Sequence, residues 1–191
     1  TAALAAGNDV TIQTGAYNAA DSTALGTVDG ALGQMVLLAP ITPNITTGNP
    51  TLTLRSGFVL TLNQAIIASG GPLNVNLYVA ATDSQNAPTV VVGTIGANAN
   101  IVTNGGNLTF TSGLGTFIQG PAAGISFTTK GGAVQFLPAV LSGTGGVATA
   151  DIFLANSGGL TIDTTDGAGG AGSVSFGGKI DSGNSYTFVN T

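Results

Sequence analysis

The 191-residue chain contains no cysteine, no histidine and no tryptophan. Its eight acidic residues are all aspartate, and its only basic residues are Arg55, Lys130 and Lys179. Without cysteine, the chain forms no disulfide, offers no thiolate to a metal and has no thiol nucleophile. Three basic residues are too few for the positive footprint of a nucleic-acid-binding surface. The absence of glutamate and the scarcity of lysine also disfavour long exposed helices, which use both residues.

Long apolar runs are missing as well. The longest run, residues 35–39, is far shorter than the roughly 18 apolar residues that indicate a membrane-spanning helix. The glycine-rich stretches do not match the phosphate-binding pattern G-x-x-x-x-G-K-[ST]. The scattered aspartates form no motif for paired-carboxylate catalysis. We therefore expect no membrane insertion, no cofactor and no enzymatic activity.

The residues that are present indicate a folded, β-rich chain. Hydrophobic residues make up 43% of the sequence and charged residues only 6%, which is the opposite of a disordered composition. The 31 glycines show no collagen-like period of three, and many of them occur in pairs. A surface of threonine, serine, asparagine and glycine suits an extracellular protein, or one whose faces are covered by neighbours.

Short segments with an apolar residue at every second position predict strands. The clearest is 73–79, in which asparagines alternate with apolar residues. Similar patterns occur at 9–14, 51–54, 58–62, 107–111, 125–129, 133–136, 151–154, 160–163, 173–176 and 186–189. Glycine pairs separate many of these segments, and glycine and asparagine provide the backbone conformations that tight bends need.

The spacing of the later segments indicates their topology. From Phe110 to Ile162, large inward candidates follow one another at 17, 9, 17 and 9 residues, so equivalent positions recur about every 26 residues. An imperfect repeat of this length, with two or three short strands, is typical of a coil of a β-solenoid. We therefore predict an all-β parallel β-helix with Gly/Asn-rich corners. The alternative is an antiparallel β-sandwich, which also has short, regularly spaced strands.

The expected organisation is one continuous domain. Residues 1–50 are less regular and form an arm or cap with the first strands, whereas residues 51–191 form the solenoid repeats. Residues 1–7 are alanine-rich and suit either one turn of helix or an extended arm.

Two segments near the end of the chain carry a resemblance to a known family. Residues 158–167 read GGLTIDTTDG, and residues 172–181 read GSVSFGGKID. This pattern resembles the repeats of large bacterial surface adhesins of the filamentous-haemagglutinin and autotransporter-passenger type. The resemblance implies a parallel β-helix, secretion to the cell surface and a stalk-like or adhesive role, without catalytic residues in the repeats.

These observations predict a structural and adhesive extracellular protein. It is either a fibre unit that assembles end to end with copies of itself or part of a giant adhesin, flanked by repeats of the same chain. Host or surface glycans are further candidate partners. Solenoid ends are unpaired β edges that recruit another chain unless they are blocked. The candidate assembly edges are Val10, Thr11, Ile12, Tyr186, Thr187 and Phe188.

Two other functions remain open. The first is a pilin-like β-sandwich, in which residues 1–14 would complete the sheet of the next subunit. The second is a carbohydrate-binding β-helix.

Few residues are candidates for a metal or modification site. Asp163, Asp166 and Asp181 lie near glycines and are weak candidates for binding Ca²⁺ through oxygen ligands. Asn44 and Asn107 each begin an N-x-T acceptor sequence for N-glycosylation.

Overall fold

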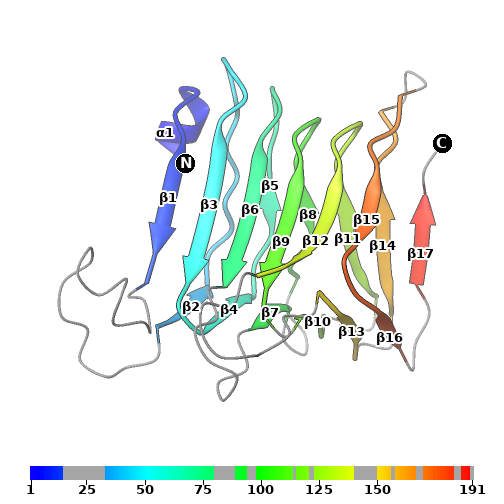
Figure 1. The fold of residues 1–191 in the computed structure, drawn as a ribbon. Helices are drawn as coiled ribbons and strands as arrows, with labels where there is room; N and C mark the ends of the chain where they lie inside the picture. The colour runs from blue at the N-terminus through cyan, green and yellow to red at the C-terminus, as the bar shows by residue number, and fades with distance from the viewer. Residues whose placement is uncertain are drawn as a thin grey trace.

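The structure is a computed structural model that describes residues 1–14, 33–79, 89–93, 98–113, 115–120, 123–139, 150–155, 158–166, 170–182 and 186–189. In this part of the chain, short strands wind into a β-solenoid with three parallel sheets (Figure 1). A single turn of helix, α1 (Ala2–Ala5), precedes the first strand. Of the two alternatives expected for residues 1–7, the structure has the helical turn. None of the described helices is long and apolar enough to cross a membrane.

The three sheets are named by their strands in spatial order. Sheet A contains β1 (Val10–Gln13), β3 (Thr51–Ser56), β6 (Asn74–Val79), β9 (Leu108–Ser112), β12 (Val134–Pro138) and β15 (Val174–Phe176). Sheet B contains β2 (Gln34–Leu37), β4 (Val59–Leu62), β7 (Thr89–Val92), β10 (Gly115–Ile118), β13 (Ile152–Leu154) and β16 (Ile180–Ser182). Sheet C contains β5 (Ile66–Ile67), β8 (Ile101–Val102), β11 (Ile125–Thr128), β14 (Leu160–Asp163) and β17 (Tyr186–Val189).

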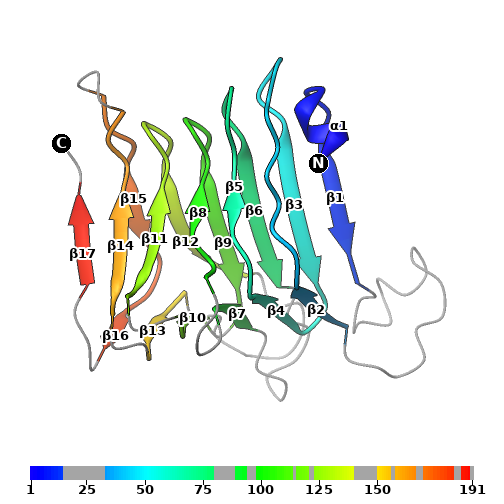
Figure 2. The ribbon, with the colours of Figure 1, turned by 180° about the vertical axis from the view of Figure 1, so that it is seen from behind.

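The chain visits the sheets in the order A, B, C, and each circuit forms one coil. Seen from the two opposite sides, successive coils lie next to one another from the N-terminal to the C-terminal end (Figures 1 and 2). The first coil joins sheet C through parallel bridges from Ile41 to Ile66 and from Asn44 to Ser69. Sheet A contains one strand from each coil, so the described residues form six coils.

The parallel pairing confirms the predicted β-helix and rules out the antiparallel sandwich for the described residues. Every pair of named strands is parallel, and the one antiparallel bridge between described residues, from Thr165 to Ala171, lies outside these strands. Parallel strands in one sheet need a long crossover rather than a hairpin. Here the crossover is the rest of the coil.

The predicted repeat of about 26 residues is only partly right. Leu108 pairs with Val134 at the predicted spacing, but the step from Val134 to its own partner, Val174, is much longer. The step in the second coil, from Leu52 to Val75, is shorter than predicted. Connections between strands differ in length from coil to coil, whereas the strands keep their register. The cross-section of the coil is therefore repeated, but its length in sequence is not.

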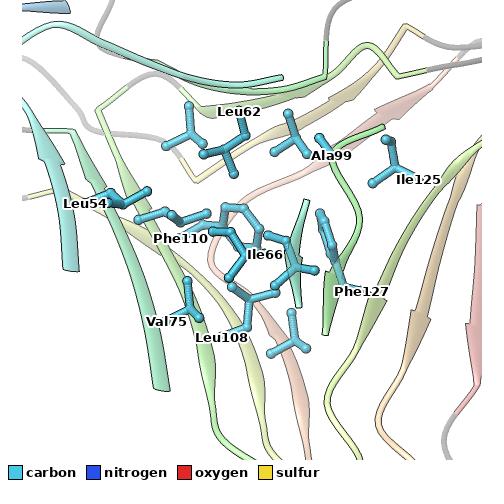
Figure 3. Close-up of a cluster of buried hydrophobic side chains, with 14 of the residues drawn as sticks. Leu54, Leu62, Ile66, Val75, Ala99, Leu108, Phe110, Ile125 and Phe127 are labelled. Carbon is cyan, nitrogen blue, oxygen red and sulfur yellow. The ribbon is translucent and has the colours of Figure 1, made fainter. Parts of the chain in front are cut away.

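Alternation of side chains separates the core from the surface. In β3 and β6, every second residue is buried, and the residues between are half-buried on the outer face. Apolar side chains from the three sheets converge on one continuous interior, among them Leu54, Leu62, Ile66, Phe110 and Phe127 (Figure 3). Burial of each such side chain contributes roughly 1.5–3 kcal/mol.

Aromatic side chains stack along the interior as the backbones do. The rings of Phe110 and Phe136, in successive coils, have centroids 4.7 Å apart and planes inclined by 5°. The ring of Phe176 continues the stack at 5.5 Å from Phe136. Each stacked pair adds about 0.5–1.5 kcal/mol beyond the buried area.

The corner between sheets C and A uses a repeated Thr-x-Gly-Gly turn. The hydroxyl of Thr103 donates to the carbonyl of Gly106, and the hydroxyl of Thr129 donates to the carbonyl of Gly132. A Cβ atom on Gly132 would overlap the carbonyl oxygen of Gly106, so successive corners approach too closely for any side chain. Glycine at this corner is thus required by backbone packing, as the predicted Gly-rich corners imply.

Polar side chains connect the coils at the start of sheet A. The Asn74 side-chain oxygen accepts a hydrogen bond from the backbone N–H of Asn107 at 3.0 Å, and the Asn107 oxygen accepts one from Ala133 at 2.8 Å. In the first coil, Asp9 accepts from the N–H of Thr51 at 2.7 Å in the same way. This ladder pairs backbone N–H groups at the first residue of a strand or directly before it.

Candidate functional site

A hollow of about 440 Å³ lies on the outer face of sheet A, across β3, β6 and β9. Its lining comes from two outward positions on each of these three strands: Thr53, Arg55, Asn76, Tyr78, Thr109 and Thr111. All six side chains are half-buried. The hollow is therefore a shallow depression in a flat sheet rather than a deep pocket.

Strand register creates the rows that line this hollow. The period of two in a strand places Thr53 and Arg55 on the same outer face. Arg55 pairs with Tyr78, and Tyr78 pairs with Thr111, so these three form one row across the sheet. The second row contains Thr53, Asn76 and Thr109. Residues 51–56 and 74–79 share the same alternating pattern, and this was the sequence signal for the site. Sequence reasoning did not identify the site from it.

The only arginine of the chain is held within the hollow by an aromatic ring. The guanidinium carbon of Arg55 lies 5.2 Å from the centre of the Tyr78 ring. A guanidinium over a tyrosine face is attracted by about 0.5–1 kcal/mol at exposed sites. The site therefore presents one positive charge over an aromatic ring, together with hydroxyl groups and an amide.

The chemistry of the lining suits recognition rather than bond cleavage. Guanidinium groups form paired hydrogen bonds with carboxylates, and threonine and asparagine side chains both donate and accept. The six lining residues include no carboxylate, so the hollow itself has no general acid or base pair for glycoside hydrolysis. It can hold a hydroxyl-rich ligand that carries a carboxylate.

The three aspartates that were considered for Ca²⁺ do not form one site. Asp163 ends β14 in sheet C, and its carboxylate accepts hydrogen bonds from the Thr165 N–H at 3.0 Å and hydroxyl at 2.8 Å. Asp166 follows in the next corner and accepts from the N–H of Gly170 at 2.8 Å. Asp181 lies on β16 in sheet B. Among the described residues, no three His, Cys, Asp or Glu side chains are grouped so that they could hold a metal ion.

The two N-x-T acceptor asparagines are both exposed. Asn44 forms a bridge with Ser69 at the N-terminal end of sheet C. Asn107 belongs to the ladder at the start of sheet A, where its oxygen is already used. Glycosylation at either position stays a prediction.

The predicted assembly edges lie in the outermost strands of the solenoid. Val10, Thr11 and Ile12 belong to β1, whose neighbour within sheet A is β3. The other predicted edge residues, Tyr186, Thr187 and Phe188, belong to β17, whose neighbour within sheet C is β14. Each of these strands is therefore last in its sheet.

Inward side chains of the end coils are less buried than their equivalents inside the stack. Ile12 is 48% exposed, whereas its register partner Leu54 is 1% exposed. In the last coil, Val174 and Phe176 are half-buried, whereas Phe136 is 1% exposed. Five other inward residues of the end coils pack only partly against the core: Val10, Met35, Leu37, Ile41 and Ile180.

Helix α1 does not cover the N-terminal edge of sheets A and B. The carbonyl of Ala5 accepts hydrogen bonds from the N–H and hydroxyl of Thr46, at 3.1 and 2.9 Å. Thr46 lies in the corner that precedes β3, so α1 stands at the corresponding corner before β1 (Figure 1). The helix buries Leu4 but leaves Ile12 half-exposed.

Comparisons of this chain with known protein families, curated proteins and solved structures found no match. The function therefore has to be inferred from the hollow over sheet A and from the two end coils.

Proposed function

We propose that this chain is a structural and adhesive extracellular segment, a solenoid rod that joins end to end with copies of itself or with further coils of a giant surface adhesin. The observation that carries the proposal is the state of the end coils. One stacking interface repeats through six coils, and its inward residues remain half-buried at both ends.

The surface supports a mechanical role. Outward positions of sheet A carry mainly uncharged polar residues, and only 6% of all residues are charged. Such a surface creates little electrostatic repulsion between copies. Each coil adds about 4.8 Å along the axis, so length grows simply by adding coils. The extracellular location is supported by the resemblance of residues 158–181 to adhesin repeats.

The pilin-like alternative loses its basis in this fold. It requires a sandwich with a free terminal arm, but β1 is already paired in parallel with β3 of the same chain.

A matched pair of substitutions in β1 tests the proposal. Ile12→Lys places a charge at the half-exposed inward position, whereas Thr11→Lys places the same charge on the outer face of the same strand. Analytical ultracentrifugation should show a sedimentation coefficient that rises with protein concentration for the wild type and for Thr11→Lys. Ile12→Lys should abolish this rise. A wild-type chain that stays monomeric at high concentration would refute end-to-end joining.

The hollow over sheet A supports carbohydrate binding as a second candidate function. Its single guanidinium and its hydroxyl groups fit an acidic polysaccharide such as polygalacturonate. Calorimetric titration should show binding to polygalacturonate but not to neutral dextran. Arg55→Gln should weaken this binding at least tenfold, whereas Lys179→Gln, which removes the same charge from an exposed site in the last coil, should not. Equal binding of both polymers would exclude a specific acidic-glycan site.

A further inference from the structure

We infer that the C-terminal coil of one copy pairs in parallel with the N-terminal coil of the next, in one fixed register. This register continues the columns of the chain, where a column is a set of residues that pair with one another from strand to strand across a sheet. This inference rests on the proposed end-to-end joining. It adds the partner surface, a second copy of this chain, and the residues that face one another.

The register follows from an unbroken column in sheet A. The column contains six aligned residues: Val10, Leu52, Val75, Leu108, Val134 and Val174. All six point inward, and the four central ones are at most 1% exposed. Continuing the column places Val10 of the next copy after Val174, and Ile12 after Phe176. Both ends of the column are apolar, so the junction would bring apolar side chains into contact with one another.

The same continuation applies to sheets B and C. In sheet B, Met35, Leu60, Val90, Thr116, Ile152 and Ile180 form one column. The next copy's Met35 therefore follows Ile180. In sheet C, the column runs from Ile41 through Ile66, Ile101, Phe127 and Ile162 to Phe188, so Ile41 follows Phe188.

Two features at the ends favour a second copy over an unrelated partner. The contact that it would make is the one already formed between successive coils within the chain, with β15, β16 and β17 of one copy meeting β1, β2 and the segment around Ile41 of the next. In addition, α1 is held to Thr46 in the corner before β3, and Ile12 of β1 remains 48% exposed, so α1 leaves this part of the contact surface open.

Charges do not oppose this register. On the outer face, Ser173 would precede Asp9, and Lys179 would precede Gln34. Asp181 would precede Val36. None of these pairs places like charges together, whereas directly opposed like charges destabilise strand pairing.

The absence of native cysteine allows a clean cross-linking test. Thr11 and Ser175 both face outward, and the inferred register makes them direct neighbours across the junction. Neighbouring parallel strands lie about 4.8 Å apart, which is within the Cα separation that a disulfide spans. Because five coil-to-coil steps separate the two residues within one chain, a disulfide between them has to join two copies.

The test compares T11C/S175C with T11C/S173C under mild oxidation on non-reducing gels. The first pair should give a ladder of dimers, trimers and longer species. The second pair is displaced by two residues, beyond the reach of a disulfide, and should give at least tenfold less product. In sheet B, V36C/D181C should reproduce the ladder. Thermal unfolding followed by circular dichroism checks that each variant is folded.

The possible results separate the register from the proposed function. Rods in electron micrographs together with equal cross-linking of both pairs, or with no cross-linking, would overturn the register and leave end-to-end joining intact. Dimers formed by T11C alone would indicate a head-to-head contact and would also overturn the register. Folded monomers with neither rods nor cross-links would refute joining, and the inferred register with it.

Discussion

The central coils and the end coils have the same sequence pattern but different burial. Leu77 and Phe110 in the middle of sheet A are at most 1% exposed, whereas Ile12 at its N-terminal edge is 48% exposed. Alternation along a strand decides which side chains point inward. The neighbouring coils determine how much of each inward side chain is buried. Each coil is therefore stabilised by its neighbours, and each end coil has a neighbouring coil on one side only within the described residues.

The largest expected effect separates a central phenylalanine from a terminal one. Phe110→Ala should lower the free energy of unfolding by about 3–5 kcal/mol, because it leaves a cavity among Phe127 and Phe136. Phe176→Ala should cost only about 1–2 kcal/mol, because that side chain is half-buried. Chemical denaturation at low protein concentration measures both. Equal losses would break the distinction between central and end coils.

A smaller effect is expected at the corner between sheets C and A. Gly132→Ala should cost about 1–3 kcal/mol, because the new Cβ overlaps the carbonyl oxygen of Gly106 and forces two coils apart. Gly71→Ala is the matched control, since its added Cβ first meets a methyl group of Ile45 at 3.1 Å. Thermal unfolding of both variants should show the larger shift for Gly132→Ala. The corner is not closely packed if the two shifts are the same.

The asparagine ladder should contribute less than the corner. Asn107→Ala removes the acceptor for the Ala133 N–H and should cost about 1 kcal/mol. Asn107→Asp keeps an oxygen at this position and is the control. Amide hydrogen exchange should show faster exchange at Ala133 in the alanine variant only. Unchanged protection at Ala133 would show that the ladder does not hold the coils together.

The smallest expected effect is on the outer face. Arg55→Gln should lower the stability by about 0.5–1 kcal/mol through the lost contact with the Tyr78 ring. Arg55→Lys preserves the charge and should lie between the wild type and Arg55→Gln. Urea denaturation measures the difference, and a loss as large as that of Phe110→Ala would show that this outer face contributes as much to stability as the core does.

Much of the coil could be predicted from local pattern. The alternation at 74–79 correctly identified the buried face of β6, and the repeat spacing correctly related Phe110 to Phe136. The same spacing wrongly related Phe127 to Phe153. Phe127 pairs with Ile162 in the interior, whereas Phe153 lies on sheet B and stacks on Phe117 at 4.5 Å. Register is set by hydrogen bonding between strands. Because the connections differ in length, the spacing of residues along the sequence does not give the register.

The candidate sites were less predictable than the fold. Arg55 and Tyr78 belong to different strands, and only the register of β3 against β6 brings them together. The edge strands β1 and β17 were identified in advance, because alternation marks the first and last strands directly. The half-burial of Val174 and Phe176 depends on the absence of a following coil, which no local pattern records.

The most direct test of end-to-end joining is cryo-electron microscopy of the concentrated wild-type chain. Joining in the inferred register predicts unbranched rods in which the strand spacing of about 4.8 Å continues without interruption across the boundary between copies. Images that show only dispersed particles of single-chain size, or rods with a break in this spacing at each junction, would contradict it.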